Sequence, residues 1–287
     1  MLFKVSPILN GKFSIENNEN DMLGMVLKRS EGKGVYRLKR GDVMKLGRMR
    51  IKLKDYRIED ATSREDKVPK EAPEGPIEVR TCNDKPVDEN DVCRICFASK
   101  NSEENPLISA CKCTGTMKFI HLQCLKSWLN LKLVIKEVSN VRSYFWQSFE
   151  CEICKGSYPY SIIQSGTRHY LVDVKKPEEG SFLMLESLDH EKNTSRIIHI
   201  ITPNETKKSF KLGRGHESDI RVGDISVSRV HAAIECNKQG IFIEDNKSKF
   251  GTLILVPKIE IASTIGRALQ VGRTLFNFEV KAQKTAQ

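Results

Sequence analysis

Short stretches of alternating apolar and polar residues occur in both halves of the chain. Before residue 59 they include KFSIE, MLGMVLKRS and GVYRLKRGDVMKLGRMRIKLKDY, and after residue 165 eight more follow at close spacing. Period-two alternation with β-branched residues and interrupting glycines is typical of β-strands. The pattern therefore predicts a multidomain, mainly β protein, with a small β unit over residues 1–58 and a β-sandwich or barrel over residues 178–287.

The middle of the chain departs from this pattern. Residues 59–91 hold four of the ten prolines and no Leu, Phe, Tyr, Trp or Met. Such a segment cannot bury a core, so residues 59–88 are predicted to be a linker. Farther on, leucines with Trp128 beside them recur at spacings of three, four and four, which predicts a helix. These leucines are Leu122, Leu125, Leu129 and Leu133. Residues 159–177 are interpreted as a connector to the C-terminal domain.

One phrase is found in both β regions. GDVMKLGRMRIKLK at 41–54 aligns with GRALQVGRTLFNFEV at 266–280. The aligned residues are Gly41 with Gly266, Gly47 with Gly272, and Arg48 with Arg273. The N-terminal unit is either a degenerate relative of the C-terminal domain or an unrelated hairpin, because any two strands joined by a Gly-Arg turn look alike.

Charge and hydropathy narrow the class of partner. Lys and Arg outnumber Asp and Glu by 47 to 37, and this excess suits acidic partners. The charge is spread along the chain without a base-stacking aromatic motif, so a nucleic-acid site is not expected. There is neither an 18-residue apolar run nor a basic-then-apolar start. We therefore expect no membrane partner and an intracellular, soluble protein, cytoplasmic or nuclear.

Seven of the nine cysteines fall between residues 93 and 154. A disulfide framework is not expected, because intracellular thiols are kept reduced. With one histidine they form four ligand pairs within 62 residues, which also disfavours a single redox pair. Eight such ligands fit two closed tetrahedral Zn²⁺ sites of a structural kind. The pairs are Cys93-x-x-Cys96, Cys111-x-Cys113, His121-x-x-Cys124 and Cys151-x-x-Cys154. Their spacing alone does not say which pairs share an ion.

This ligand order and three phrases resemble the RING-CH finger, also called RING-variant, of membrane-associated ubiquitin ligases. The phrases are CRIC, NPLISACKCTGTMKFIHLQCLKSWL and CEICKGSY, and the resemblance covers about residues 89–158. PHD fingers share the ligand order, but the seven residues between Cys113 and His121, together with Trp128, favour RING-CH. The resemblance implies a cross-brace, with Cys93, Cys96, His121 and Cys124 on one zinc and Cys111, Cys113, Cys151 and Cys154 on the other.

The resemblance also implies ubiquitin transfer without a covalent intermediate on this protein. A ubiquitin-conjugating enzyme would then contact Ile95 and Trp128, and Lys155 matches the place of a cation that holds the ubiquitin thioester. Alternatively, Ile95 and Trp128 are residues of a small core, Lys155 is a solvated charge, and the finger is an inactive docking module. The family's usual transmembrane helices have no counterpart in this sequence, so we do not expect substrates to be chosen by shared membrane residence.

Two later phrases resemble the forkhead-associated (FHA) domain, a β-sandwich that binds phosphothreonine peptides. They are SFKLGRGHESDIRVGDISVSRVHAAIE at 209–235 and IFIEDNKSKFGTLIL at 241–255, and the resemblance covers about residues 178–283. It implies that Arg214 and Ser228 bind phosphate, with Arg229 as a second cation and His231 holding the loop. The guanidinium fork suits a phosphate group.

One position departs from the FHA pattern. Where the family has Ser-x-Asn-Gly-Thr, this chain has Ser-Lys-Phe-Gly-Thr at 248–252. Phe250 lacks the donors and acceptors of an amide, so it cannot bond a peptide main chain. Either phosphopeptide binding is weakened or the loop presents Phe250 to another partner.

Two functions follow from these resemblances. The first is a soluble RING-CH-type ubiquitin ligase whose FHA domain recruits partners, phosphothreonine-containing ones among them. The alternative is a non-catalytic, zinc-stabilised scaffold. Chains that combine the two domains resemble a family associated with ciliated protists, which implies a cytoskeletal or ciliary association. A PHD-like chromatin reader is less favoured.

Overall fold

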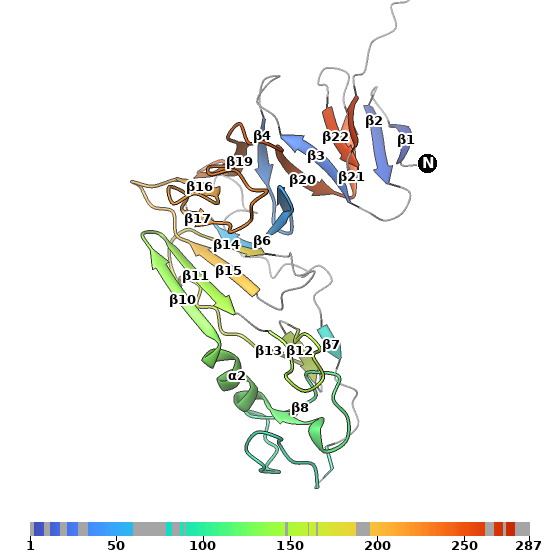
Figure 1. The fold of residues 1–287 in the computed structure, drawn as a ribbon, viewed down its shortest axis with the longest axis vertical. Coiled ribbons are helices and arrows are strands. Elements are labelled where there is room, and N and C mark those ends of the chain that lie inside the picture. Colours follow the sequence, from blue (N-terminus) through green and yellow to red (C-terminus); the bar gives the residue numbers. More distant parts are fainter. Residues whose placement is uncertain are drawn as a thin grey trace, which may run out of the picture.

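The structure is a computed structural model that describes most of the 287 residues. The described residues are 3–8, 12–17, 22–27, 34–59, 79–81, 87–88, 90–146, 149–159, 161–164, 166–187, 196–261, 267–271 and 274–278. Figure 1 shows an elongated molecule with large sheets at one end and a small lobe with a helix at the other. Within the described residues, no helix combines the length and hydropathy needed to cross a membrane.

A ten-stranded antiparallel sheet runs through the molecule. Its strands, in spatial order, are β10 (Leu133–Val138), β11 (Val141–Trp146), β15 (Arg196–Ile201), β14 (Phe182–Ser187), β6 (Met49–Arg57), β5 (Val43–Leu46), β20 (Thr252–Val256), β3 (Leu23–Leu27), β22 (Arg267–Val271) and β23 (Thr274–Phe278). This sheet forms one layer of the predicted sandwich.

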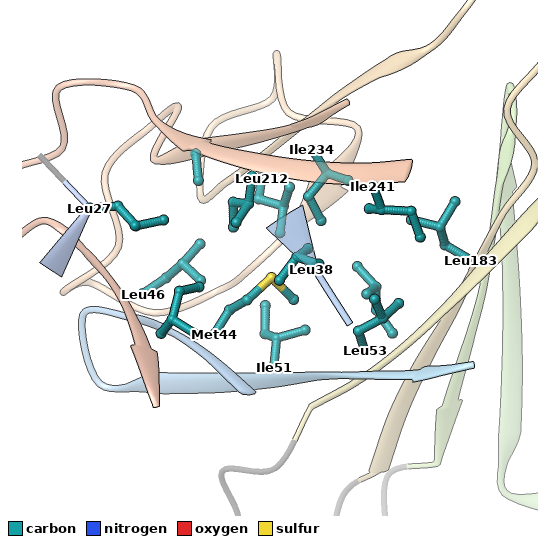
Figure 2. Close-up of a cluster of buried hydrophobic side chains, with 14 of the residues drawn as sticks. Leu27, Leu38, Met44, Leu46, Ile51, Leu53, Leu183, Leu212, Ile234 and Ile241 are labelled. Atoms are coloured by element: carbon teal, nitrogen blue, oxygen red, sulfur yellow. The ribbon is translucent and has the colours of Figure 1, made fainter. Parts of the chain in front are cut away.

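A five-stranded sheet forms the second layer. Its order is β17 (Ile220–Arg221), β16 (Ser209–Gly213), β18 (Ala232–Asn237), β19 (Gly240–Asp245) and β4 (Val35–Leu38). Apolar side chains from the two sheets meet between them in one continuous core (Figure 2). Leu46 and Leu53 of the first sheet and Leu212 and Ile234 of the second are fully buried there. The predicted C-terminal β-sandwich is confirmed.

Three smaller sheets complete the fold. One contains β1 (Phe3–Ile8), β2 (Lys12–Asn17) and β21 (Lys258–Ile261), and another contains β13 (Thr167–Tyr170), β12 (Ser161–Gln164) and β7 (Val79–Thr81). The third pairs β8 (Leu107–Ile108) with β9 (Ile120–His121) and leads into the helix α2 (Leu122–Leu131). A 3-10 turn, η3 (Gly115–Met117), precedes β9.

The N-terminal strands lie in sheets with C-terminal strands. β4 pairs with β19, β5 with β20, and β6 with β14. The strand pattern predicts a small β unit of its own over residues 1–58, whereas Leu38, Met44 and Leu53 are buried in the same core as Leu183 and Ile241 (Figure 2). Period-two patterning shows which face of a strand is buried but not which strand lies beside it, so this pairing was not apparent from the sequence.

The zinc-finger segment is inserted between two paired strands of the sandwich. Arg57, the last residue of β6, lies opposite Phe182, the first residue of β14. The chain therefore leaves the sheet after Arg57 and returns to it beside that residue, at Phe182. Between these two residues in the sequence, the hairpin of β10 and β11 adds two further strands to the same sheet, because β11 pairs with β15 over six residue pairs. The insert is thus attached to the sandwich through its ends and through a hairpin.

A second core lies beneath the insert. It gathers Leu125 and Leu129 from α2 and Trp146 from β11 together with Phe182 and Ile198 of the sandwich sheet. The predicted connector contributes to it, because Leu171 and Val172 are buried there after the β12–β13 hairpin.

The helix and the linker differ in part from their predicted extents. The predicted helix is present, but it ends at Leu131, and Leu133 begins β10 instead. The β-branched Val134 and Ile135 that follow favour a strand, and pairing with β11 satisfies their backbone. Most of the predicted linker lies outside the described residues, although Val79–Thr81 within it pairs in parallel with β12.

The structure describes the whole of the repeated phrase in the N-terminal copy and part of it in the C-terminal copy. In the N-terminal copy Gly47 and Arg48 form the turn between β5 and β6. In the C-terminal copy Gly266, Gly272 and Arg273 lie outside the described residues. The strands β22 and β23 of that copy pair antiparallel as β5 and β6 do.

Candidate metal centre

The eight predicted ligands form two separate clusters, and the predicted cross-brace grouping is confirmed. The ligand atoms of each cluster lie within 4.8 Å of one another. The first cluster contains Cys93, Cys96, His121 and Cys124, and the second contains Cys111, Cys113, Cys151 and Cys154. Cys111 and Cys154, which are 43 positions apart in the chain, thereby meet in one cluster. In the other cluster, β9 and the start of α2 place the histidine and its partner cysteine.

The two Cys-x-x-Cys loops have the same turn. Phe97 N–H donates to the Cys93 carbonyl at 2.7 Å, and Lys155 N–H donates to the Cys151 carbonyl at 2.9 Å. Both donors are non-glycine residues with positive φ, 60° and 55° respectively. This conformation is costly for such residues and persists only where surrounding contacts hold it. A metal ion bound by the two cysteine sulfurs that precede each of these residues would supply that restraint.

Backbone amides favour the thiolate form of sulfurs in both clusters. Burial opposes ionisation, but N–H donors from Cys96, His121 and Ile95 outweigh it and lower the pKa of Cys93 to about 6. Around Cys151 burial is likewise outweighed, chiefly by the amides of Cys154 and Ile153, and the pKa is again about 6. These thiols are ready to bind a cation near neutral pH.

Other sulfurs of the same clusters show the opposite shift. Burial first, and then the neighbouring cysteines, raise the pKa values of Cys113 and Cys124 to about 12. Three or four sulfurs this close cannot all ionise unless a cation offsets their charge. Zn²⁺ offsets it, and a closed set of sulfur and imidazole ligands suits this ion. The two clusters therefore fit the two zinc ions of a RING-CH finger.

Hydrogen bonding orients the histidine ligand. The Nε2 atom of His121 lies 2.8 Å from the carbonyl oxygen of Lys100, while its Nδ1 atom lies 3.2 Å from the Cys96 sulfur. A proton on Nε2 donates to the carbonyl and leaves the Nδ1 lone pair directed at the cluster. Such a bond sets both the tautomer and the ring orientation of a metal-binding histidine.

The predicted phosphate-binding residues lie together on loops of the sandwich. The N–H of Arg214 donates to the Ser228 carbonyl at 3.0 Å, and the N–H of Gly215 donates to the Arg229 carbonyl at 2.9 Å. The side chains of Arg214 and Arg229 are exposed, and Ser228 is half-buried. The loop thus joins the backbones of all three residues and leaves two cations free to face solvent.

The histidine of this region has the loop-holding geometry expected from the sequence. Buried His231 accepts a hydrogen bond from the Ser228 N–H at 3.1 Å, and its other ring nitrogen lies 3.1 Å from the Gly251 carbonyl. The Ser228 hydroxyl oxygen accepts the N–H of Lys249 at 3.0 Å. Phe250 is 56% exposed at the tip of that loop. The position that departs from the FHA pattern therefore presents an apolar ring to solvent.

Comparison with known proteins agrees with both sites. The sequence model of the RING-variant domain matches residues 93–154, and that of the FHA domain matches residues 210–262. The chain carries a RING-variant domain and an FHA domain. The RING-variant match spans all eight metal ligands. The FHA match covers β16 to β21, so β4, β5 and β6 join the FHA sheets from before the RING-variant domain.

Three curated proteins illustrate the similarity. The chain is 39% identical over 161 residues to the probable E3 ubiquitin-protein ligase MARCHF10 of Rattus norvegicus, covering 48% of this chain and 20% of that protein. It is 34% identical over 148 residues to the E3 ubiquitin-protein ligase MARCHF7 of Pongo abelii, covering 51% of this chain and 19% of that protein. With the probable E3 ubiquitin ligase SUD1 of Arabidopsis thaliana, 40% identity extends over 76 residues, 26% of this chain and 6% of the relative.

These similarities are limited in extent. The chain spans about a fifth of the length of the first two relatives. No solved structure matches it.

The RING-variant domain presents its predicted contact residues at the surface. Ile95 is 42% exposed and Lys155 is exposed, whereas Trp128 is half-buried under Lys132, whose ammonium lies 4.6 Å from the ring centroid. Ile153 is not among the predicted contact residues, yet it is 58% exposed between two ligands of the second cluster, as Ile95 is between two ligands of the first. The Cys-x-Ile-Cys motif that both loops share could have revealed this equivalence.

Proposed function

We propose that this protein is a RING-CH-type ubiquitin ligase that binds a ubiquitin-conjugating enzyme and recruits protein partners through its FHA domain. The observation that carries the proposal is the pair of exposed isoleucines, Ile95 and Ile153, at equivalent places on the two zinc-binding loops. Exposed apolar residues held on rigid loops suit a protein contact. The relatives named as E3 ubiquitin ligases support the same activity.

The RING-variant domain is assigned a positioning role: it binds the conjugating enzyme and forms no covalent intermediate itself. Zinc supplies structural cross-links between loops, and each cluster already has four protein ligands, so no thiol of the clusters is free to act as a nucleophile. Ile95, Trp128 and Ile153 provide the apolar contact with the conjugating enzyme. Exposed Lys155 holds the charged thioester through its ammonium group, and ubiquitin passes directly from the enzyme to a substrate lysine.

Substrate recruitment is assigned to the FHA loops. Arg214 and Arg229 provide cations and the Ser228 hydroxyl a further donor, a combination that recognises phosphate. A phosphothreonine-containing partner fits this combination. Phe250 replaces an amide-bearing residue, so bonds to the peptide main chain would be fewer and binding weaker by about 1–3 kcal/mol than in an FHA loop with asparagine.

The alternative function is a non-catalytic scaffold with a cytoskeletal or ciliary association. Exposed Phe250 favours it, because an apolar ring at the loop tip suits an unphosphorylated protein partner. In that case the RING-variant domain is a zinc-stabilised docking module that joins other proteins.

A ubiquitin-discharge assay tests the ligase proposal. The zinc-loaded protein should accelerate transfer of ubiquitin from at least one member of a conjugating-enzyme panel to free lysine, and Ile95→Ala and Trp128→Ala should abolish most of this acceleration. Ile135→Ala serves as the control, since Ile135 is 53% exposed on β10, outside the two zinc-binding loops. An inactive parent protein, or equal activity in all variants, would contradict the proposal.

A separate binding experiment tests the FHA assignment. A phosphothreonine peptide library should bind the parent protein and lose affinity with Arg214→Ala or Ser228→Ala, whereas the exposed Arg221 on β17 supplies the control variant Arg221→Ala. Binding that is equal for phosphorylated and unphosphorylated peptides, and that Phe250→Ala removes, would favour the scaffold instead.

A further inference from the structure

Arg94 connects the two metal clusters. Its backbone lies between Cys93 and Ile95, in the loop of the first cluster, but its guanidinium contacts two sulfurs of the second cluster. The Nη1 atom lies 3.6 Å from the Cys111 sulfur, and the Nη2 atom lies 3.3 Å from the Cys151 sulfur. One side chain therefore belongs to one site by position and to the other by contact.

The guanidinium is held in place by two further acceptors. Nη1 donates to the Met117 carbonyl at 2.7 Å, and Nη2 donates to the Tyr158 hydroxyl at 3.2 Å. The backbone N–H of Arg94 also donates to the Phe119 carbonyl at 3.1 Å. Each Nη group carries two N–H donors, so all four have an acceptor. A lysine ammonium has only three donors and lacks the planar fork, so it cannot reproduce this set of contacts.

Electrostatics explains why the cation faces the second cluster. Four thiolates around one Zn²⁺ leave a formal charge of −2, whereas three thiolates and a neutral imidazole leave −1. The guanidinium thus lies beside the more negative site. Charged donors to ligating sulfurs offset their charge and restrain their orientation, which strengthens metal retention.

We propose that Arg94 is a positioning residue that links the two zinc sites, holding the thiolates of the Cys111, Cys113, Cys151 and Cys154 site from the loop of the other site. Its loss should weaken zinc retention at this four-cysteine site more than at the histidine-containing one. The effect expected for a residue that supports metal ligands is about 10- to 100-fold in metal affinity. This inference does not depend on ubiquitin transfer.

Zinc release to a chromogenic chelator tests the proposal in the full chain. Arg94→Gln should accelerate release of one zinc equivalent by roughly tenfold or more and leave the other much less affected. The protein loaded with ¹¹³Cd then assigns the weakened site by NMR, since a four-sulfur site and a site with one nitrogen give separate resonances. The four-sulfur resonance should shift and broaden in the variant.

Arg142→Gln is the matched control. Arg142 lies on β11 of the same insert and pairs with Glu137 at 2.8 Å, away from the sulfurs. Release from Arg94→Gln that equals release from this control, or a change confined to the histidine-containing site, would overturn the proposal.

If Arg94→Gln does not fold, two milder variants, Arg94→Lys and Tyr158→Phe, test the same role of Arg94. Arg94→Lys retains the charge without the fork, and Tyr158→Phe removes one acceptor that fixes it. Both should release the four-cysteine zinc several-fold faster than the parent, with Tyr158→Phe the milder of the two. Parental zinc release in both variants would refute the role assigned to Arg94.

Discussion

The RING-variant insert and the sandwich are stabilised by different means. The sandwich buries a continuous apolar core between two sheets, in which Leu53, Phe210 and Ile254 are fully buried. The insert has a smaller core and two clusters of four metal ligands. Apolar burial grows with the size of a domain, so a lobe this small depends on its cross-links, whereas the sandwich does not.

The two regions nevertheless share strands. In β14, Leu183 and Leu185 point into the sandwich core, while Phe182 and Met184 point into the core of the insert. Successive side chains of a strand face opposite sides of its sheet, so one strand can serve two cores. A metal-dependent lobe is thereby packed against a metal-independent one instead of being tethered to it by a flexible linker. The following predictions test how far the two remain separable.

Removing zinc should have the largest effect. Structural zinc contributes on the order of 10 kcal/mol per site, so a strong chelator should unfold the insert. Both tryptophans of the chain, Trp128 and Trp146, lie in the insert. Their fluorescence should shift to the red while the far-ultraviolet signal of the sandwich persists. Simultaneous loss of both signals would show that the two regions unfold as one cooperative unit.

Truncating Trp146 should have the next largest effect. This side chain is fully buried, stacks on Tyr144 at 6.1 Å and meets Phe149 edge-on. Trp146→Ala should lower the free energy of unfolding of the insert by about 3–5 kcal/mol, measured by urea titration of the zinc-loaded protein. Trp128→Ala, at a half-buried position, is the comparison and should cost less. Equal losses would mean that the core of the insert contributes little beyond its metals.

Acid should destabilise the fold through a histidine that lies where β15 of the sandwich pairs with β11 of the insert. His199 of β15 is buried, with its Nδ1 atom 2.7 Å from the Ser143 hydroxyl on β11, and burial lowers its pKa from 6.5 to about 4. The unfolded chain therefore binds more protons between about pH 4 and pH 6.5, so stability falls as the pH falls through this window. From pH 7 to pH 5 the loss from this residue is about 2 kcal/mol.

A His199→Gln variant measures that contribution. Urea unfolding at pH 7 and pH 5 should show a smaller pH dependence in the variant than in the parent, by the amount attributed to His199. The same pH dependence in both proteins would assign the acid sensitivity to the metal-binding thiols instead.

The smallest effect should come from the N-terminal turn that docks on the FHA loops. Arg48 bonds the Ser226 hydroxyl through its N–H at 2.8 Å, and its guanidinium pairs with Asp224 at 3.0 Å, but its side chain is 72% exposed. Arg48→Ala should therefore cost less than about 1 kcal/mol. In a thermal melt Gly47→Ala should cost more, because Gly47 has a φ of 60° and an added Cβ would lie 2.3 Å from the Ser226 hydroxyl. The reverse order would mean that the ion pair, and not the close approach of the backbone, attaches the N-terminal strands.

Local patterns in the sequence were reliable where the chemistry is local. The ligand pairs, the start of α2 near His121 and the strands of the sandwich were predicted because each depends on residues a few positions apart. The predicted end of α2 was wrong by two residues, since Leu133 fits the helical spacing yet belongs to β10. There the pairing of β10 with β11 outweighs helical periodicity.

The sequence by itself determined the kind of bonding in each region: thiol and imidazole pairs for two zinc ions, and alternating apolar residues for a sandwich. The tertiary structure decided which strands are neighbours in the sheets and which side chains meet across the two clusters. It paired β4, β5 and β6 with strands far along the chain, and it placed the guanidinium of Arg94 on sulfurs of the other cluster. The physical reason is that ligand chemistry and strand periodicity are properties of short segments, whereas strand partners and contacts across two loops depend on how the whole chain minimises its exposed apolar surface and unpaired charge.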